Sequence, residues 1–271
     1  MEPNDREAGF DGAPRRRRKQ VAIQARDVRV MEMLVTRRVE TLDELHERGF
    51  PNRSRKRALN RLGELVSGGY LDRRSVQLAD SERLQSVYFL TSRGRTALQI
   101  RSEESSGWFA TRHWRLDLNE PSIPHQIVTN RVCDWLGANA IPEHLLPPKP
   151  YEPEKKEKDA QSRPDAVFRA REGRNGADLV WVEVDLGHYN QKRIAEKVKA
   201  AGEERNVCLL LIACPNKARE EWLVNVLLKH FGGSIWERVD VRTFAELRSG
   251  IAPDHDERLR PSDERPTGYD L

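Results

Sequence analysis

Two short acidic phrases in the second half of the chain have the residue types and spacing of a metal-dependent phosphodiesterase. They are Arg163-Pro164-Asp165 and Glu183-Val184-Asp185. Alternation along a strand places Glu183 and Asp185 on one face, and carboxylates inside an apolar strand are costly to bury without compensation. Mg²⁺ compensates them, because it binds one or two carboxylates together with water and phosphate oxygens. We therefore expect Asp165, Glu183 and Asp185 to form a metal site that polarises a scissile phosphate and activates water.

A purely structural role is the alternative for these carboxylates. Arg163, Lys197 or backbone amides would then satisfy them at the end of a strand. The position of Lys197 bears on this choice. At 100° per residue it falls on the apolar stripe of its helix, so it is predicted to point towards the sheet.

The elements that must position these residues alternate between helices and strands. Apolar periodicity and capping residues predict a domain over residues 123–250 with the order α-β-β-β-α-β, continued by a helix and a strand. The strand at 207–213 is apolar throughout, which is typical of a central parallel strand covered on both faces. The predicted helices cover residues 123–136, 190–201 and 216–231, and the other strands with predicted bounds cover residues 165–170, 179–186 and 240–244. Residues 147–161 are expected to form an exposed hairpin or loop.

The first half of the chain reads as a winged helix-turn-helix domain over residues 25–100. Three helices are expected near residues 26–38, 42–49 and 54–67. The second begins with the capping box Thr41-Leu42-Asp43-Glu44. Two strands, at 70–74 and 87–90, and a closing helix to residue 98 complete the unit.

This unit has the charge of a module that binds duplex DNA. The second helix of a helix-turn-helix pair enters the major groove with its N-terminus first, and here that end is strongly basic. Arginine contacts guanine edges or phosphates. A winged helix used only for protein contacts is the alternative. The residues predicted to contact DNA are Arg53, Arg55, Lys56, Arg57, Arg61, Arg73 and Arg74.

The second domain resembles the PD-(D/E)XK nuclease superfamily. Pro164-Asp165 fits its first motif and Glu183-Val184-Asp185 occupies the second, but Asp185 stands where the motif has lysine. Some members draw this basic or amide group from the following helix. The resemblance therefore implies a catalytic set of Asp165, Glu183 and Asp185 with Lys197 or Gln191; Lys192 is less well placed. Mg²⁺ is the implied cofactor if this site is active.

Over about 220 residues the chain also resembles the replication-relaxation family of bacterial plasmids and mobile elements. The phrases that carry this resemblance are Arg26-Asp27-Val28, Gly69-Tyr70-Leu71, Val87 to Gly94, a helix with His125, Arg163 to Ala166, Glu183 to Gly187 and a helix with Lys197. The resemblance implies a role in plasmid replication, relaxation or mobilisation. Relaxase or replication proteins are the implied partners, together with a second copy of the chain.

Charge, hydropathy and cysteine content favour an anionic partner and argue against a membrane span and a disulfide framework. Residues 1–100 hold 21 Lys/Arg and 14 Asp/Glu, a net charge of +7, whereas the remainder carries −3. The basic half therefore favours an anionic partner. No apolar run approaches the length of about 20 residues that crosses a bilayer. Three cysteines without C-x-x-C spacing argue against zinc and disulfides and favour the cytoplasm.

Three segments outside the two domains are read from composition. Residues 1–24 are expected to be a disordered basic arm, since they contain the run Arg15 to Lys19. That run either neutralises phosphates or is simply a solvated tail. Residues 101–122 read as a connector and residues 251–271 as a polar tail.

The sequence leads to three functional hypotheses. The first is a bacterial DNA-binding protein that acts in plasmid or mobile-element replication, relaxation or mobilisation. The second is an active Mg²⁺-dependent endonuclease or nickase. The third is a winged-helix transcription regulator whose second domain dimerises or senses a partner.

Overall fold

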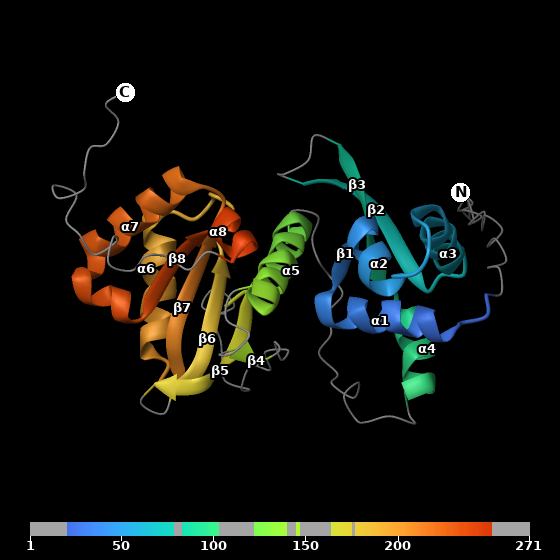
Figure 1. Cartoon of the computed structure of the whole chain (residues 1–271), viewed down its shortest axis with the longest axis horizontal. Coiled ribbons are helices and arrows are strands. Elements are labelled where there is room, and N and C mark those ends of the chain that lie inside the picture. Colours follow the sequence, from blue (N-terminus) through green and yellow to red (C-terminus); the bar gives the residue numbers. More distant parts are fainter. Residues whose placement is uncertain are drawn as a thin grey trace, which may run out of the picture. The chain divides into compact units, whose positions relative to one another are not determined.

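Two separate sheets organise the chain, and helices pack on both of them (Figure 1). The computed structural model describes residues 21–78, 83–102, 122–139, 145–146, 164–174 and 177–250. These residues fall into two compact units, divided between Leu118 and Asn119. The architecture is mixed α/β, as expected, and the division lies inside the predicted connector.

The first unit contains helices around a three-stranded antiparallel sheet of order β1-β3-β2. The chain runs through helices α1, α2 and α3 before it forms the β2–β3 hairpin, and α4 follows. The bounds are α1 Ala25–Arg37, β1 Val39–Thr41, α2 Leu42–Gly49, α3 Arg55–Ser67, β2 Leu71–Gln77, β3 Leu84–Leu90 and α4 Ser92–Ser102.

Local sequence signals set the ends of these helices. The Thr41 Oγ1 atom accepts from the Glu44 amide at 3.3 Å, and the Glu44 carboxylate accepts from the Thr41 amide at 2.9 Å, so the predicted capping box is confirmed. Ser54 caps α3 through the Arg57 amide. Gly69 follows that helix with φ of 74°, a left-handed conformation that glycine adopts at little cost.

One glycine in this unit is required by a close approach of backbone. A Cβ atom at Gly94 would lie 2.2 Å from the Tyr70 carbonyl oxygen. No side chain fits there, and the start of α4 can therefore pack directly on the strand entry. The core beneath consists of Val30, Met31, Leu34, Leu45, Leu62, Leu65, Leu71, Tyr88 and Leu98 with their neighbours.

The second unit is a five-stranded mixed sheet of order β4-β5-β6-β7-β8. The pairs β4–β5 and β5–β6 are antiparallel, and β6–β7 and β7–β8 are parallel. The bounds are α5 Ser122–Asn139, β4 Leu145–Leu146, β5 Ala166–Arg174, β6 Ala177–Val184, α6 Gln191–Glu203, β7 Val207–Cys214, α7 Lys217–Phe231, the 3-10 helix η2 Gly233–Glu237, β8 Val239–Thr243 and α8 Phe244–Ser249.

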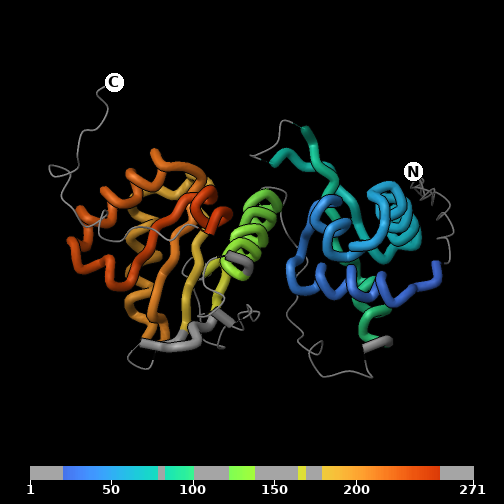
Figure 2. The backbone as a smooth tube through the Cα atoms, in the orientation of Figure 1, coloured from blue at the N-terminus to red at the C-terminus, as the bar shows by residue number. Residues whose placement is uncertain are grey.

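Helices cover both faces of this sheet, so the second unit has three layers (Figures 1 and 2). One core lies between the sheet and the helices α6 and α7, where Trp181, Ile194 and Leu223 meet. The other lies between the sheet and the helices α5 and α8, where Val182 meets Val132. Neighbouring residues of β6 thus enter opposite cores, as the period of two requires.

The structure contains the helices and strands for which bounds were predicted, and several details differ. The pairing of Val39–Thr41 with β3 was missed, because a three-residue strand gives no alternation to detect. Leu59 of α3 is 36% exposed. The predicted arm up to residue 20, most of the connector, the expected hairpin or loop at 147–161 and the polar tail lie outside the described residues. Among the residues that are described, no helix is both long and apolar enough to cross a membrane.

Candidate functional site

The acidic strand end lies on the face of the sheet that α6 and α7 cover. Glu183 is 1% exposed and Asp185, directly after β6, is 0% exposed. Val182 and Val184 enter the opposite core with α5 and α8. The alternation predicted for this strand is therefore confirmed, and both carboxylates are buried.

Asp165 reaches the same strand end from the neighbouring strand. It lies just before β5, which pairs antiparallel to β6 with Ala166 opposite Val182. The Asp165 amide donates to the Val182 carbonyl at 3.0 Å, and its carboxylate accepts from the Val184 amide at 2.8 Å. Since antiparallel pairing brings the start of one strand to the end of the next, Asp165 and Glu183 share one edge.

A lysine from α6 neutralises Glu183 inside the core. The Lys197 Nζ atom lies 2.8 Å from Glu183 Oε1, and the two side chains are 5% and 1% exposed. The inward stripe predicted for α6 is confirmed, because Ile194, Val198 and Ala201 are buried with Lys197. Asn190 caps the helix through the Arg193 amide at 2.9 Å and so fixes where the helix begins.

Negative charge exceeds positive charge around Glu183. Burial and the neighbouring charge of Asp165 raise the pKa of the Glu183 carboxyl to about 8, and the Lys197 ammonium opposes that shift. The Tyr189 hydroxyl donates to Glu183 Oε2 at 3.4 Å. Burial and the two acids Asp165 and Glu183 raise the pKa of the Tyr189 phenol, so Tyr189 acts here as a neutral donor.

His125 of α5 completes this edge. Its Nε2 atom lies 2.9 Å from the Val184 carbonyl oxygen and 3.3 Å from Asp165 Oδ2. Burial lowers the pKa of the imidazole, but the hydrogen bond and the charge of Asp165 outweigh burial, and the net shift is upward. The sequence indicated His125 only through its place in a shared series of motifs, and no local pattern predicted its contact with Asp165.

Asp185 has a different environment from the one predicted. Arg219 of α7 donates through Nε to Asp185 Oδ2 at 2.6 Å, and the Gly187 amide donates to Oδ1 at 2.8 Å. The Arg219 guanidinium also donates to the Tyr189 carbonyl and stacks 3.9 Å from the Trp222 ring. Asp185 therefore fastens the loop between β6 and α6. Arg219 was missed because it follows Asp185 by 34 residues.

The three predicted metal ligands do not form one cluster. Among the described residues, no group of three or more His, Cys, Asp and Glu side chains is arranged to hold a metal ion. Asp185 is committed to Arg219, while Asp165 and Glu183 remain at one edge. Asp165 and Glu183, with His125 and Lys197 beside them, are the described carboxylates that could hold a cation together with water ligands.

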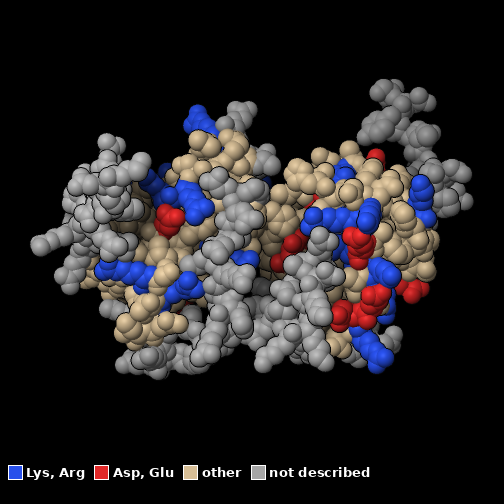
Figure 3. Space-filling model, turned by 180° about the vertical axis from the view of Figure 1, so that it is seen from behind, with Lys and Arg blue, Asp and Glu red and all other residues tan. Residues whose placement is uncertain are grey.

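The first unit presents most of its predicted DNA contacts at the surface. Arg53, Arg55, Lys56 and Arg57 are exposed at the start of α3, and Arg55 pairs with Asp43 at 2.7 Å. Arg73 and Arg74 are exposed on β2, and the Arg74 guanidinium lies over the Phe89 ring. The face of this unit seen in Figure 3, on its left, shows many basic and few acidic side chains.

Arg61 does not belong to this surface. Its side chain is 11% exposed, and the guanidinium donates to both carboxylate oxygens of Asp27, to Glu64 and to the Ala22 carbonyl. The hydrogen bond to Asp27 raises the pKa of Arg61 further, although burial opposes it. These partners all lie within the first unit, so Arg61 has a structural role there, and its predicted contact with DNA stays a prediction.

Comparison with known proteins bears on both units. The sequence model of the replication-relaxation family matches residues 31–200, which is more than half of the chain. The chain belongs to the replication-relaxation family. No curated protein and no solved structure matches it. The matched segment runs from α1 into α6 and includes Asp165, Glu183 and Lys197, so these residues lie within the part shared by replication-relaxation proteins.

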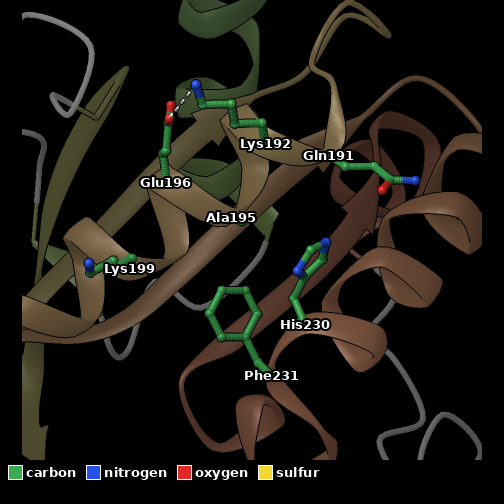
Figure 4. Close-up of a pocket in the computed structure, with 7 residues that line it drawn as sticks. All are labelled: Gln191, Lys192, Ala195, Glu196, Lys199, His230 and Phe231. Atoms are coloured by element: carbon green, nitrogen blue, oxygen red, sulfur yellow. Dashed lines mark ion pairs between the residues drawn. The ribbon is translucent and has the colours of Figure 1, made fainter.

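Gln191 lies apart from the strand end that carries Asp165 and Glu183. It is exposed and lines a pocket of about 550 Å³ between α6 and the end of α7 (Figure 4). Lys192 pairs there with Glu196 at 3.9 Å, and His230 and Phe231 form the opposite wall. Of the three polar candidates on α6, the structure brings Lys197 to Glu183 and leaves Gln191 and Lys192 at the surface.

Proposed function

We propose that this replication-relaxation protein binds duplex DNA through its first unit and acts in the replication, relaxation or mobilisation of a plasmid or mobile element. Family membership supports the biological setting. The unit has the element order of a winged helix, in which three helices precede a β-hairpin. In that arrangement α3 is the recognition helix and the β2–β3 hairpin is the wing.

The observation that carries this proposal is the cluster of exposed cations at the start of α3. Arg53, Arg55, Lys56 and Arg57 lie at the end that would enter the major groove first. Exposed cations attract the DNA backbone, and each phosphate contact releases a condensed counterion. Arg73 and Arg74 on the proposed wing extend the same charge towards the flanking backbone.

Salt-dependent binding tests this proposal. Lys56→Ala with Arg57→Ala is expected to weaken binding to a DNA duplex in fluorescence anisotropy. The slope of log K against log salt is expected to fall by up to about 1.8, since each lost contact removes about 0.9. Lys192→Ala with Lys199→Ala removes the same charge from exposed positions on α6 and serves as the control. An unchanged affinity and slope in the folded α3 variant would end the proposal.

The edge formed by Asp165, Glu183 and Lys197 favours a second candidate function, that of a Mg²⁺-dependent endonuclease or nickase with a PD-(D/E)XK fold. Asp165 and Glu183 would hold the ion, and Lys197 would supply the positive charge that the motif normally places at position 185. A bound Mg²⁺ polarises a phosphate and lowers the pKa of a water molecule. His125 holds Asp165 in place, and Tyr189 holds Glu183.

Plasmid cleavage separates the two functions. Nicking of supercoiled plasmid in Mg²⁺ or Mn²⁺ by the wild type, and not by Asp165→Ala, would establish the nuclease. Binding without cleavage in either metal would leave the second unit as a nuclease-like fold that adds contacts to DNA, to a relaxase, to replication proteins or to a second copy of the chain. Footprints at a promoter rather than at an origin would indicate the transcription regulator instead. A duplex DNA partner supports a cytoplasmic location for the protein.

A further inference from the structure

Arg55, the first residue of α3, is held by an acidic residue of the preceding helix. Its Nε atom donates to Asp43 Oδ1 at 2.7 Å. The side chains of Arg55 and Asp43 are 59% and 70% exposed, so the pair lies at the surface. Asp43 belongs to the first turn of α2. The pair therefore joins α2 to the end of α3 that would enter the major groove first.

Side-chain hydrogen bonds also hold the backbone next to Arg55. The His46 Nε2 atom of α2 lies 2.7 Å from the Arg53 carbonyl oxygen. The Ser54 hydroxyl accepts from the Arg57 amide at 3.4 Å and caps α3. Because the turn is fastened at these points, the backbone from which the Arg55 side chain extends is fixed.

Stability gives little reason for the pair of Arg55 and Asp43. An exposed ion pair contributes at most about 1 kcal/mol to folding. Asp43 also brings a negative charge to the end of α3 where Arg53, Lys56 and Arg57 are exposed. A carboxylate at such a place weakens the general attraction of DNA phosphates. Its effect on the direction of one guanidinium is therefore the more useful contribution.

The contact with Asp43 leaves the outer edge of the Arg55 guanidinium available. A guanidinium carries five N–H donors in a planar fork. The bond to Asp43 uses Nε, and the terminal nitrogens Nη1 and Nη2 form no hydrogen bond within the described part of the chain. Two parallel donors match the O6 and N7 acceptors of guanine in the major groove. Contact with a phosphate carries no sequence information and needs no such orientation.

We propose that Arg55 reads a guanine of the DNA site through Nη1 and Nη2, and that Asp43 is the positioning residue that orients it. Lys56 and Arg57 contact phosphates in this arrangement. The inference rests on the proposed binding of duplex DNA by α3. It gives the two partners opposite effects on affinity, because Arg55 adds charge and a base contact, whereas Asp43 lowers general affinity and raises selectivity.

Selection of bound duplexes from a random DNA library tests this inference, because it needs no known site. The site selected by the wild type is expected to contain a guanine whose preference is lost in Arg55→Ala. Changing that base pair should weaken binding of the wild type by about 5- to 150-fold and have no effect on the variant. Placing 7-deazaguanine there removes the N7 acceptor, so it should weaken binding of the wild type but not of Arg55→Ala.

Asp43→Ala gives a readout that a purely structural role would not produce. The preference for guanine at the same position should fall, while affinity for random duplex DNA should rise because a negative charge is removed. Glu47→Ala removes the same charge from an exposed position on α2 and is the matched control. It should leave the base preference unchanged.

The outcomes separate this inference from the proposed function. Unchanged base preferences in Arg55→Ala and Asp43→Ala would overturn the reading of guanine by Arg55. Equal affinity of the wild type for the selected site and for every 7-deazaguanine version of it would do the same, whether or not the variants fold. Insensitivity of binding to Lys56→Ala with Arg57→Ala would instead overturn DNA binding by α3.

Discussion

Replacing Lys197 by Met is the most direct test of how the second unit is built. The ammonium lies 2.8 Å from Glu183, and both side chains are almost completely buried. Met keeps much of the aliphatic volume and removes the charge. Glu183 then stays in the core beside Asp165, and the hydrogen bond from the Tyr189 hydroxyl remains.

The expected loss follows from the burial of the pair. Breaking a buried ion pair on one side costs about 3–5 kcal/mol, because the remaining charge is left without compensation. Proton uptake by Glu183, whose pKa is already raised to about 8, holds the loss near the lower end of that range at neutral pH. The double change Glu183→Gln with Lys197→Met is expected to recover a large part of the stability, since it removes both charges.

Urea unfolding followed by tryptophan fluorescence is a suitable assay in a buffer with EDTA. Trp135, Trp181, Trp222 and Trp236 belong to the second unit, so the signal reports mainly on it. For a slope near 2 kcal/mol per M, a loss near 3 kcal/mol should lower the midpoint by about 1.5 M.

An exposed ion pair on the same helix provides the matched control. Lys199 and Glu203 lie 3.8 Å apart with side chains 75% and 69% exposed. Lys199→Met should therefore cost at most about 0.5 kcal/mol. If Lys197→Met were no more harmful than Lys199→Met, the assignment of Lys197 as the buried partner of Glu183 would be refuted.

Three further predictions concern the buried charges of Glu40 and Asp185 and metal binding at Glu183. Burial raises the pKa of Glu40 to about 9 in spite of Arg37 and Arg48 at 2.9 and 3.6 Å, and the carboxyl of Glu44 adds to the rise. The folded state therefore holds this proton more tightly than the unfolded state, so stability is full below about pH 4.5 and is lost as pH rises towards 9. Thermal unfolding should show this decline in the wild type and a flatter profile in Glu40→Gln; a persistent decline would point to another group. Arg219→Met removes the guanidinium that pairs with Asp185 and should destabilise the second unit by about 3–5 kcal/mol. Arg193→Met, at an exposed position over the Tyr189 ring, is the control and should cost less than about 1 kcal/mol. Equal losses would contradict the role of Asp185 in holding the loop. Mn²⁺ or Mg²⁺ at about 100 times its dissociation constant should stabilise the wild type by about 2.7 kcal/mol and should not stabilise Glu183→Ala. Equal thermal shifts in the two proteins would argue against metal binding by Asp165 and Glu183.

Features that depend on residues close together in the sequence could be predicted. The capping box at Thr41 and Glu44, the alternation that turns Glu183 away from Val184, and the inward stripe of α6 with Lys197 follow from residues that are neighbours in the chain. Backbone geometry alone sets these relations, because a strand repeats every two residues and a helix every 3.6. They hold wherever the element is placed.

The identity of a partner across the fold could not be predicted in the same way. The sequence placed Arg61 with the basic face of α3, and Asp27, 34 residues earlier, turns it inward. It placed Asp185 with the metal ligands, and Arg219, 34 residues later, binds it instead.

What the sequence by itself determined is therefore which residues share a face, and what the tertiary structure decided is which charges meet. Lys197 shows both parts. Its helical phase predicted that it points to the sheet, but the parallel crossover from β6 through α6 to β7 brings it within 2.8 Å of Glu183. A buried charge must find a partner inside the protein, because burial without one costs several kcal/mol. Packing of whole elements selects that partner, and their relative placement is not encoded in any local repeat.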